Sequence, residues 1–190
     1  MALLRSAATV GLLTLMSRVL GFLRDMLTAA FLGAGPVTDA FFVAQRLPNL
    51  FRSLFAEGAF NAAFVPLFAG AIATDGRPAA KRFAEDALAV LVTALFVFVA
   101  AAEVFAPAFV RVLAPGFADD PEKFALTVAL ARVTFPYLLY ISLASLQSGI
   151  LNSVERFAAA AATPMLLNLF LIGAMLVVRP VNGYVLAWAI

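Results

Sequence analysis

The sequence contains no cysteine and no histidine. Without cysteine the chain has no disulfide and no thiolate nucleophile, and without either residue it lacks the Cys and His ligands of zinc sites. The absence of histidine also removes the commonest general base of enzymes. Charged residues are scarce as well, at 13%. Any catalysis or ligand binding by charged or reactive side chains must therefore use carboxylates, hydroxyls, lysine or arginine.

Apolar residues, by contrast, make up 64% of the 190 positions, and the mean hydropathy is +1.02. Soluble proteins are nearer about 45–50% apolar and about 25% charged. The composition therefore predicts an all-α integral membrane protein, a multi-pass helical bundle. The net charge is only +2, and the chain has neither a run of basic residues nor a glycine-rich phosphate loop. These features give no indication of a nucleic-acid partner.

Apolar stretches of spanning length, about 20 residues or more, recur along the chain. Short segments rich in glycine, proline and charge separate them and predict turns. Pro48 predicts a bend or a break within the second helix. The first stretch continues past its early arginines without a cleavage site, so we expect a retained helix and not a signal peptide. We expect six helices, the last one incomplete, at 7–32, 38–70, 83–113, 124–152, 157–178 and 184–190.

Basic residues are distributed unevenly between the two sets of connecting segments. If the N-terminus lies inside, the inner segments hold Arg5, Arg77, Lys81, Arg82 and Arg156, and the outer ones hold Arg111, Lys123 and Arg179. The positive-inside rule therefore predicts a cytoplasmic N-terminus. The chain ends at Ile190, in an apolar run too short to span, so we expect it to be the front part of a longer protein.

Seven ionisable residues fall on the first two predicted helices. A charge at the centre of a spanning helix costs roughly 2.5–3.5 kcal/mol, so such charges rarely face lipid. We interpret the set as the lining of a wet cavity. Arginines outnumber acids four to three, and arginine matches phosphate in bidentate fashion, which favours an anionic ligand such as a diphosphate. The seven are Arg18, Arg24, Asp25, Asp39, Arg46, Arg52 and Glu57.

A plainer interpretation stays open for these charges. They would then be internal salt bridges, such as Arg18–Asp25 or Arg46–Asp39, or side chains that reach the membrane interfaces. Ser142, Ser145 and Ser148 on the fourth predicted helix also have two interpretations, as cavity lining or as small residues that let helices pack. We favour packing for the serines, and we interpret Asn168 in the same way.

Helical spacing assigns the polar residues to faces. Residues seven apart differ by about 20° in angle around a helix, so Ser17 and Arg24 share a face of the first helix. On the second helix Asn49 flanks the main polar stripe, and Arg52 lies off it. The stripe itself contains Asp39, Arg46, Ser53 and Glu57.

Several long segments carry a resemblance to a known family. They read SRVLGFLRD at 17–25, GAGPVTDAFFVAQRLPNLFRSLFAEGAFNAAFVPLFA at 33–69, and APGF with KFALT within 114–127. Together they resemble the MurJ (MviN) family of bacterial lipid II flippases, in the MOP exporter superfamily. The similarity continues to LAWAI near the end and covers nearly all of the chain.

This resemblance implies a fold of two six-helix lobes around a central cationic cavity, with two further helices. The chain would be the N-terminal lobe and would require the C-terminal lobe as its partner. The family is a transporter of the bacterial cytoplasmic membrane and not an enzyme. It moves lipid II, the lipid-linked peptidoglycan precursor, to the outer leaflet by alternating access, coupled to the membrane potential or an ion. The resemblance implies no cofactor, and it places the ion site on later helices.

The resemblance also implies roles for individual residues. Arginines would hold the diphosphate, polar residues would assist them, and acids would pair with the arginines in the empty cavity or hold a gate. We add Asp25 and Arg46 to the gating or charge-pairing set from their positions. The substrate-binding set is then Ser17, Arg18, Arg24, Asn49 and Arg52, and the gating set is Asp25, Asp39, Arg46 and Glu57.

Three alternative functions remain at this point. The chain would belong to another MOP-type exporter, for polysaccharide-linked lipids or drugs, or it would be a non-transporting fragment or scaffold. The third is an intramembrane enzyme that uses Asp39 or Glu57 beside an arginine. No metal-binding cluster or nucleophile motif in the sequence favours the enzyme.

Overall fold

The computed structural model describes residues 2–53 and 59–190, and the side chains of residues 8–53 and 62–190. Every element in these ranges is a helix, as the sequence predicts. The elements are α1 (Ala2–Leu32), α2 (Pro36–Arg52), α3 (Ala59–Thr74), α4 (Gly76–Leu113), the 3₁₀ helix η2 (Pro115–Phe117), α5 (Pro121–Thr134), α6 (Tyr137–Ser153), α7 (Phe157–Val177) and α8 (Gly183–Ala189).

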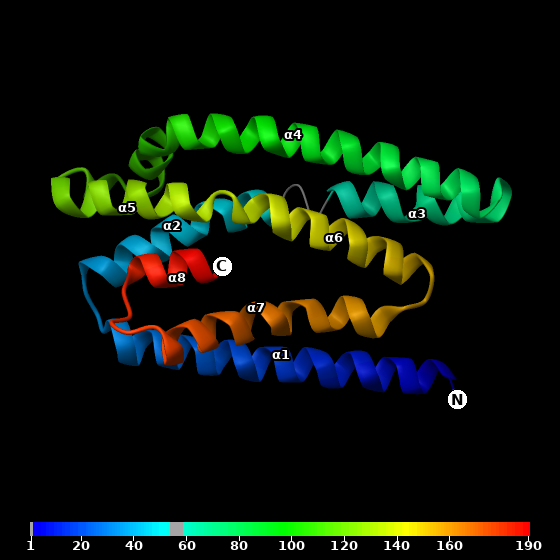
Figure 1. The fold of residues 1–190 in the computed structure, drawn as a ribbon, viewed down its shortest axis with the longest axis horizontal. Helices are drawn as coiled ribbons and strands as arrows, with labels where there is room; N and C mark the ends of the chain where they lie inside the picture. The colour runs from blue at the N-terminus through cyan, green and yellow to red at the C-terminus, as the bar shows by residue number, and fades with distance from the viewer. Residues whose placement is uncertain (1, 54–58) are drawn as a thin grey trace.

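The long helices run roughly along one common axis (Figure 1). α4 lies along one edge of the bundle, and α1 and α7 lie side by side along the opposite edge. α2, α5 and α6 lie between these edges, and α1 packs mainly against α7. The N-terminus, the α3–α4 turn and the α6–α7 turn share one end, which we call the N-terminal end. The α1–α2, α4–α5 and α7–α8 connections share the other end, the opposite end.

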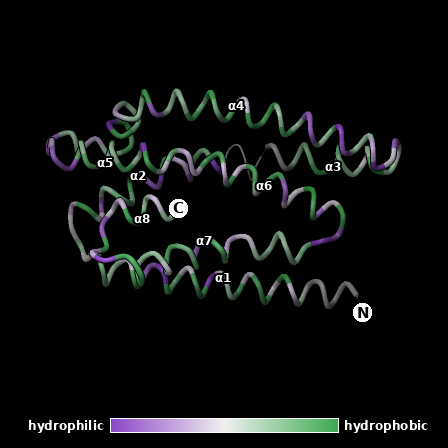
Figure 2. The backbone as a smooth tube through the Cα atoms, viewed as in Figure 1, coloured by the Kyte–Doolittle hydropathy of each residue, from purple (hydrophilic) through white to green (hydrophobic). Residues whose placement is uncertain are grey.

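Three segments of the described chain are long and apolar enough to cross a membrane: Gly76–Leu113, Pro121–Ser153 and Phe157–Val177. The second of them comprises α5 and α6. Figure 2 shows α4 as hydrophobic over most of its length, with hydrophilic residues at the N-terminal end. The chain is therefore an all-helical membrane bundle.

The sequence predicts a bend or a break at Pro48, and the structure rules out the break. Pro48 is buried inside α2, and the helix continues to Arg52. A proline has no N–H, so the carbonyl four residues earlier loses its helical donor. The carbonyl in question belongs to Ala44, and the Thr134 hydroxyl of α5 donates to it over 3.2 Å. Because a neighbouring helix satisfies the freed carbonyl, α2 continues through the proline.

The predicted polar segment between the second and third helices is also helical. α3 extends to Thr74 and α4 begins at Gly76, seven residues before the predicted start at 83. Gly76 has φ 82°, a left-handed conformation that glycine adopts readily, and this permits a turn of one residue. The predicted start at 83 is too late because hydropathy identifies only the apolar part of α4. The first turns of the helix carry charged residues and lie at the end of the bundle.

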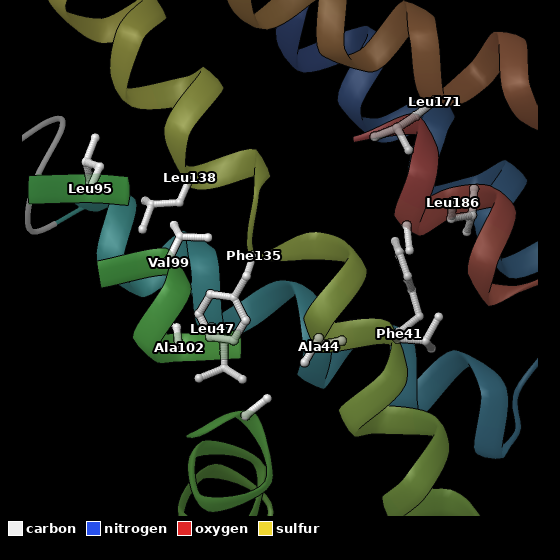
Figure 3. Packing of buried hydrophobic residues seen from close by; sticks show 14 of the residues in the cluster. Phe41, Ala44, Leu47, Leu95, Val99, Ala102, Phe135, Leu138, Leu171 and Leu186 are labelled. Atoms are coloured by element: carbon white, nitrogen blue, oxygen red, sulfur yellow. The ribbon is translucent and has the colours of Figure 1, made fainter. Parts of the chain in front are cut away.

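The fourth predicted helix, at 124–152, is two helices, since α5 ends at Thr134 and α6 starts at Tyr137. Phe135 lies in the turn between them and is fully buried. Its ring points toward Leu47 of α2 and Val99 of α4 (Figure 3). The bend thus places an aromatic ring where three segments meet, and it fixes the position of α6 relative to α2.

Candidate functional site

Helix α2 has a buried face and, beside it, a polar face. Ala40, Ala44 and Leu47 are buried, and α2 packs closely against α5. At about 100° per residue, Gln45 and Arg52 fall almost together on the neighbouring face. The packing of the small residues therefore orients α2 and turns Arg52 toward the space between α2, α6 and α7.

That space is a cavity of about 710 Å³, which we call the central cavity. Its lining comes from α1, α2, α6 and α7, which are distant in sequence. Ile141, Leu167 and other apolar residues form part of the wall. The polar lining residues are Arg24, Gln45, Asn49, Arg52, Tyr137, Ser145, Ser148, Thr163 and Asn168.

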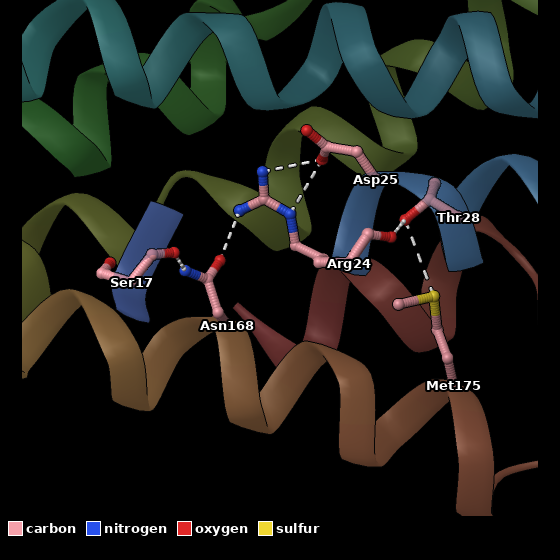
Figure 4. A network of polar contacts seen from close by, with 6 residues as sticks. All are labelled: Ser17, Arg24, Asp25, Thr28, Asn168 and Met175. Carbon is pink, nitrogen blue, oxygen red and sulfur yellow. Dashed lines mark hydrogen bonds and ion pairs between the residues drawn. The ribbon is translucent and has the colours of Figure 1, made fainter. Parts of the chain in front are cut away.

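A hydrogen-bonded network holds Arg24 between α1 and α7 (Figure 4). Arg24 Nη1 donates to Asn168 Oδ1 over 2.9 Å, and Asn168 Nδ2 donates to the Ser17 carbonyl over 3.1 Å. Arg24 Nε and Nη2 both donate to Asp25 Oδ1, over 3.0 and 2.8 Å. The Arg24 side chain is 27% exposed. The guanidinium is therefore partly buried and fixed in orientation before any ligand arrives.

The spacing of seven residues explains how α1 and α7 build this network. Ser17 and Arg24 lie on one face of α1, and Thr28 follows one turn later. Asn168 and Met175 occupy matching positions on α7, and the Thr28 hydroxyl lies 3.6 Å from Met175 Sδ and donates to it (Figure 4). These contacts between α1 and α7 therefore fix the position of Arg24.

The central cavity is cationic. Its described lining contains two guanidinium groups, those of Arg24 and Arg52, and no carboxylate. The other polar lining groups are neutral amides and hydroxyls. Arginine in a partly buried site interacts more strongly with an anion than it does in bulk water, because the local dielectric constant is lower.

A small void adjoins the central cavity, and Arg24 and Gln45 line both. It measures only about 10 Å³, and its lining also includes Asp25, Phe41, Leu171 and Leu186. Leu171 and Leu186 are buried. The packing beside Arg24 therefore leaves little space on the side of α8.

A second, open groove lies on the adjacent face of α2, and we call it the α2 groove. It has a volume of about 720 Å³. The predicted stripe is present here, since Asp39, Arg46 and Ser53 line the groove with Asn49 at its border with the central cavity. Glu57, which the sequence places on the same stripe, lies outside the described residues.

Asp39 has a different partner from the one the sequence suggests. Its Oδ2 accepts a hydrogen bond from Lys123 Nζ over 2.7 Å, whereas the expected partners were arginines. Lys123 Nζ also lies 4.0 Å from the centroid of the Phe117 ring. Asp120 caps α5 by accepting from the Lys123 N–H over 3.0 Å, which places Lys123 in the first turn beside α2. We call this set the Asp39–Lys123 cluster.

The structure thus brings part of the predicted set together. Arg24, Asn49 and Arg52 line the central cavity. Ser17 contributes its carbonyl, and Asp25 pairs with Arg24 and not with Arg18. Arg18 is exposed on α1, outside the described lining.

Sequence reasoning missed several lining residues. Gln45 was overlooked, although it lies seven positions before Arg52 and that spacing identifies it. Ser145, Ser148 and Asn168 line the central cavity, where we had favoured a packing role. The packing interpretation fits Ser142, which is buried.

Comparison with known proteins agrees with this architecture. The family model described as "Lipid II flippase MurJ" matches residues 28–190. The chain belongs to the MurJ family. A "Probable lipid II flippase MurJ" of Rhizobium tropici is 54% identical over 176 residues, covering 92% of this chain and 33% of that protein.

Two further relatives extend the match. The "Lipid II flippase MurJ" of Burkholderia cenocepacia is 42% identical over 193 residues, covering 100% of this chain and 37% of the relative. A solved structure described as "Lipid II flippase MurJ, inward closed conformation" has a TM-score of 0.77 and 26% identity, covering 95% of this chain and 38% of that one. The chain therefore spans about a third of the length of the MurJ relatives it matches.

Proposed function

We propose that this chain is the N-terminal lobe of a flippase that moves lipid II from the inner to the outer leaflet of the bacterial cytoplasmic membrane. One observation carries the proposal: a partly enclosed cavity whose described lining has two arginines, seven neutral polar side chains and no carboxylate. Such a lining suits a ligand with a compact anionic group and many hydroxyl or amide groups. A sugar-linked diphosphate has both.

Arg24 and Arg52 have the central role in this proposal. Each guanidinium has five N–H donors in a planar fork that matches phosphate oxygens. Three N–H groups of Arg24 bond to Asp25 and Asn168, so two are free to bind an anion. Gln45, Asn49 and the serines would then bond to the sugar and peptide part.

Transport itself belongs to the longer protein. Alternating access requires two lobes that rock against each other around the binding site, and relatives are about three times as long as this chain. The lipid tail of the substrate stays in the bilayer while the head group occupies the central cavity. Coupling to the membrane potential or an ion would involve groups beyond this lobe.

The distribution of basic residues supports a cytoplasmic N-terminal end. The α3–α4 and α6–α7 turns lie at this end (Figure 1). The first turns of α4 carry Arg77, Lys81 and Arg82, and the α6–α7 turn carries Arg156. The opposite end has fewer basic residues, which fits the positive-inside rule.

The test uses the full-length protein in vesicles that contain lipid II, with the rate of appearance of lipid II in the far leaflet as the readout. We expect Arg24→Gln and Arg52→Gln each to lower that rate at least tenfold, because each removes one of the two cations. Arg82→Gln is the matched control, since Arg82 is exposed on α4 and outside the described cavity lining. Unchanged rates in both cavity variants would contradict the proposal. Competition by a polysaccharide-linked lipid as strong as that by lipid II would favour the other exporter class.

A further inference from the structure

A third cavity lies at the N-terminal end, and its lining shares no described residue with that of the central cavity. It has a volume of about 890 Å³ and lies between α3, α4 and α6 at the α6–α7 turn. We call it the terminal groove. It contains Arg77, Lys81 and Arg156 as cations and Glu155 as the one acid of its described lining.

The basic residues of the terminal groove are arranged on a fixed frame. Arg77 and Lys81 are four residues apart on α4, so they occupy the same face of the helix. Arg156 approaches from the α6–α7 turn. There the Arg156 N–H donates to the Leu151 carbonyl over 2.8 Å, and the Glu155 N–H donates to the Asn152 carbonyl over 3.1 Å. These two bonds form a Schellman motif, which fixes the backbone of Arg156 relative to α6.

The inner wall of the terminal groove is apolar. Phe68, Ile72 and Ile150 contribute to it, and Phe68 is only 6% exposed. The Phe68 ring stacks on the Phe64 ring with centroids 5.4 Å apart, and Phe64 stacks on Phe83 of α4. The wall is thus a packed surface that connects α3 with α4. Ile72 and Ile150 are the partly exposed members of this wall, and a free phosphate would leave them uncovered.

The length of α4 is compatible with a groove at the depth of the lipid head groups. α4 has 38 residues and is about 57 Å long, whereas the hydrocarbon core of a bilayer is about 30 Å thick. Because α4 is longer than the core and charge is costly within it, we expect the first turns of α4, which carry Arg77 and Lys81, to extend beyond the hydrocarbon core. The apolar wall continues from these turns toward the membrane interior along α3 and α6.

We propose that the terminal groove binds an anionic phospholipid, with the phosphate between Arg77, Lys81 and Arg156 and an acyl chain along the apolar wall. Charge complementarity commits the site to a lipid of net negative charge, because its described lining has three cations and one acid. Lys81 also pairs with the exposed carboxylate of Glu85 at 3.5 Å, so Arg77 and Arg156 supply most of the attraction. Basic pockets at the ends of membrane helices are suited to anionic head groups, and each basic residue near the surface contributes about 1 kcal/mol. This site is separate from lipid II transport and does not rest on it.

The test measures the dissociation constant of the first bound lipid on the full-length protein in neutral detergent, by native mass spectrometry. The probes are dioleoylphosphatidylglycerol and dioleoylphosphatidylcholine. We expect the anionic lipid to bind at least tenfold more tightly. Arg77→Gln and Arg156→Gln should each weaken it about fivefold, and Glu155→Gln should tighten it.

Two control variants test whether the lipid binds at the terminal groove or at basic residues elsewhere in the protein. Arg82→Gln removes a charge from the same end of α4 but outside the described groove lining, and should change the constant less than twofold. Arg52→Gln, in the central cavity, should also leave it unchanged. Equal losses in Arg82→Gln and Arg77→Gln, or equal binding of the two lipids, would overturn the proposal. Displacement of the lipid by millimolar glycerol 3-phosphate would show a free-phosphate site and would overturn it as well.

Discussion

The central cavity and the Asp39–Lys123 cluster differ in the groups that contact their cations. Both are built from helix residues that are far apart in sequence, and both contain cations beside α2. In the cluster, Lys123 meets the carboxylate of Asp39 at 2.7 Å. In the central cavity, two arginines face neutral amides and hydroxyls in the described lining. Lys123 thus joins α5 to α2 through a carboxylate, whereas Arg24 is shared between the carboxylate of Asp25 and the neutral amide of Asn168.

Arg24 shows this difference within one residue. It pairs with Asp25, whose side chain is 60% exposed, so solvent weakens that attraction. Its other partner, Asn168, orients the guanidinium without neutralising it. The arrangement holds Arg24 in place with no carboxylate in the described lining of the central cavity.

The largest expected effect comes from reversing a cavity charge. Arg52→Glu in the full-length protein should raise the dissociation constant for lipid II at least a hundredfold, about 2.7 kcal/mol, because it removes an attraction and adds a repulsion. The measurement is equilibrium binding of labelled lipid II in detergent. Arg82→Glu is the control and should alter the constant less than threefold. An equal effect of the two variants would mean that overall charge, and not the cavity, governs binding.

A smaller effect should follow from making the central cavity resemble the Asp39–Lys123 cluster. Asn168→Asp keeps the size of the side chain and places a carboxylate against Arg24. We expect about a tenfold loss of lipid II affinity, because Arg24 would then be paired on both sides. Asn168→Ser provides the matched neutral control, with a loss of threefold or less. The comparison between the two regions would fail if Asn168→Asp bound lipid II as tightly as the wild type.

The smallest effect concerns the Asp39–Lys123 cluster itself. The Asp39 side chain is 56% exposed, so solvent screens the pair, and it should stabilise the fold by less than about 1 kcal/mol. A double-mutant cycle of Asp39→Asn and Lys123→Gln, read by unfolding of the full-length protein in detergent, measures the coupling. A coupling well above 1 kcal/mol would show that the pair is less screened than its exposure indicates.

The sequence predicted what helical periodicity controls. Spacing identified the stripe of Asp39, Arg46 and Ser53 and correctly placed Arg52 off it. The same spacing put Ser17 and Arg24 on one face of α1. The composition and the segments similar to MurJ also predicted the all-helical membrane fold and the family.

Tertiary contacts between distant residues could not be predicted in this way. Asn168 lies 144 residues from Arg24, and Lys123 lies 84 residues from Asp39. No local pattern connects those partners, because the connection depends on which helices pack together. The absence of a break at Pro48 has the same cause, since Thr134 of α5 donates to the carbonyl that the proline leaves free.

The most direct test of the central claim compares a diphosphate with a monophosphate head group. The measurement is the dissociation constant of the full-length protein for lipid II and for an analogue with one phosphate, in the wild type and in an Arg24→Gln, Arg52→Gln double variant. We predict that the wild type prefers the diphosphate about tenfold and that the double variant loses this preference. A double variant that retained the full preference would show that these two arginines do not hold the diphosphate.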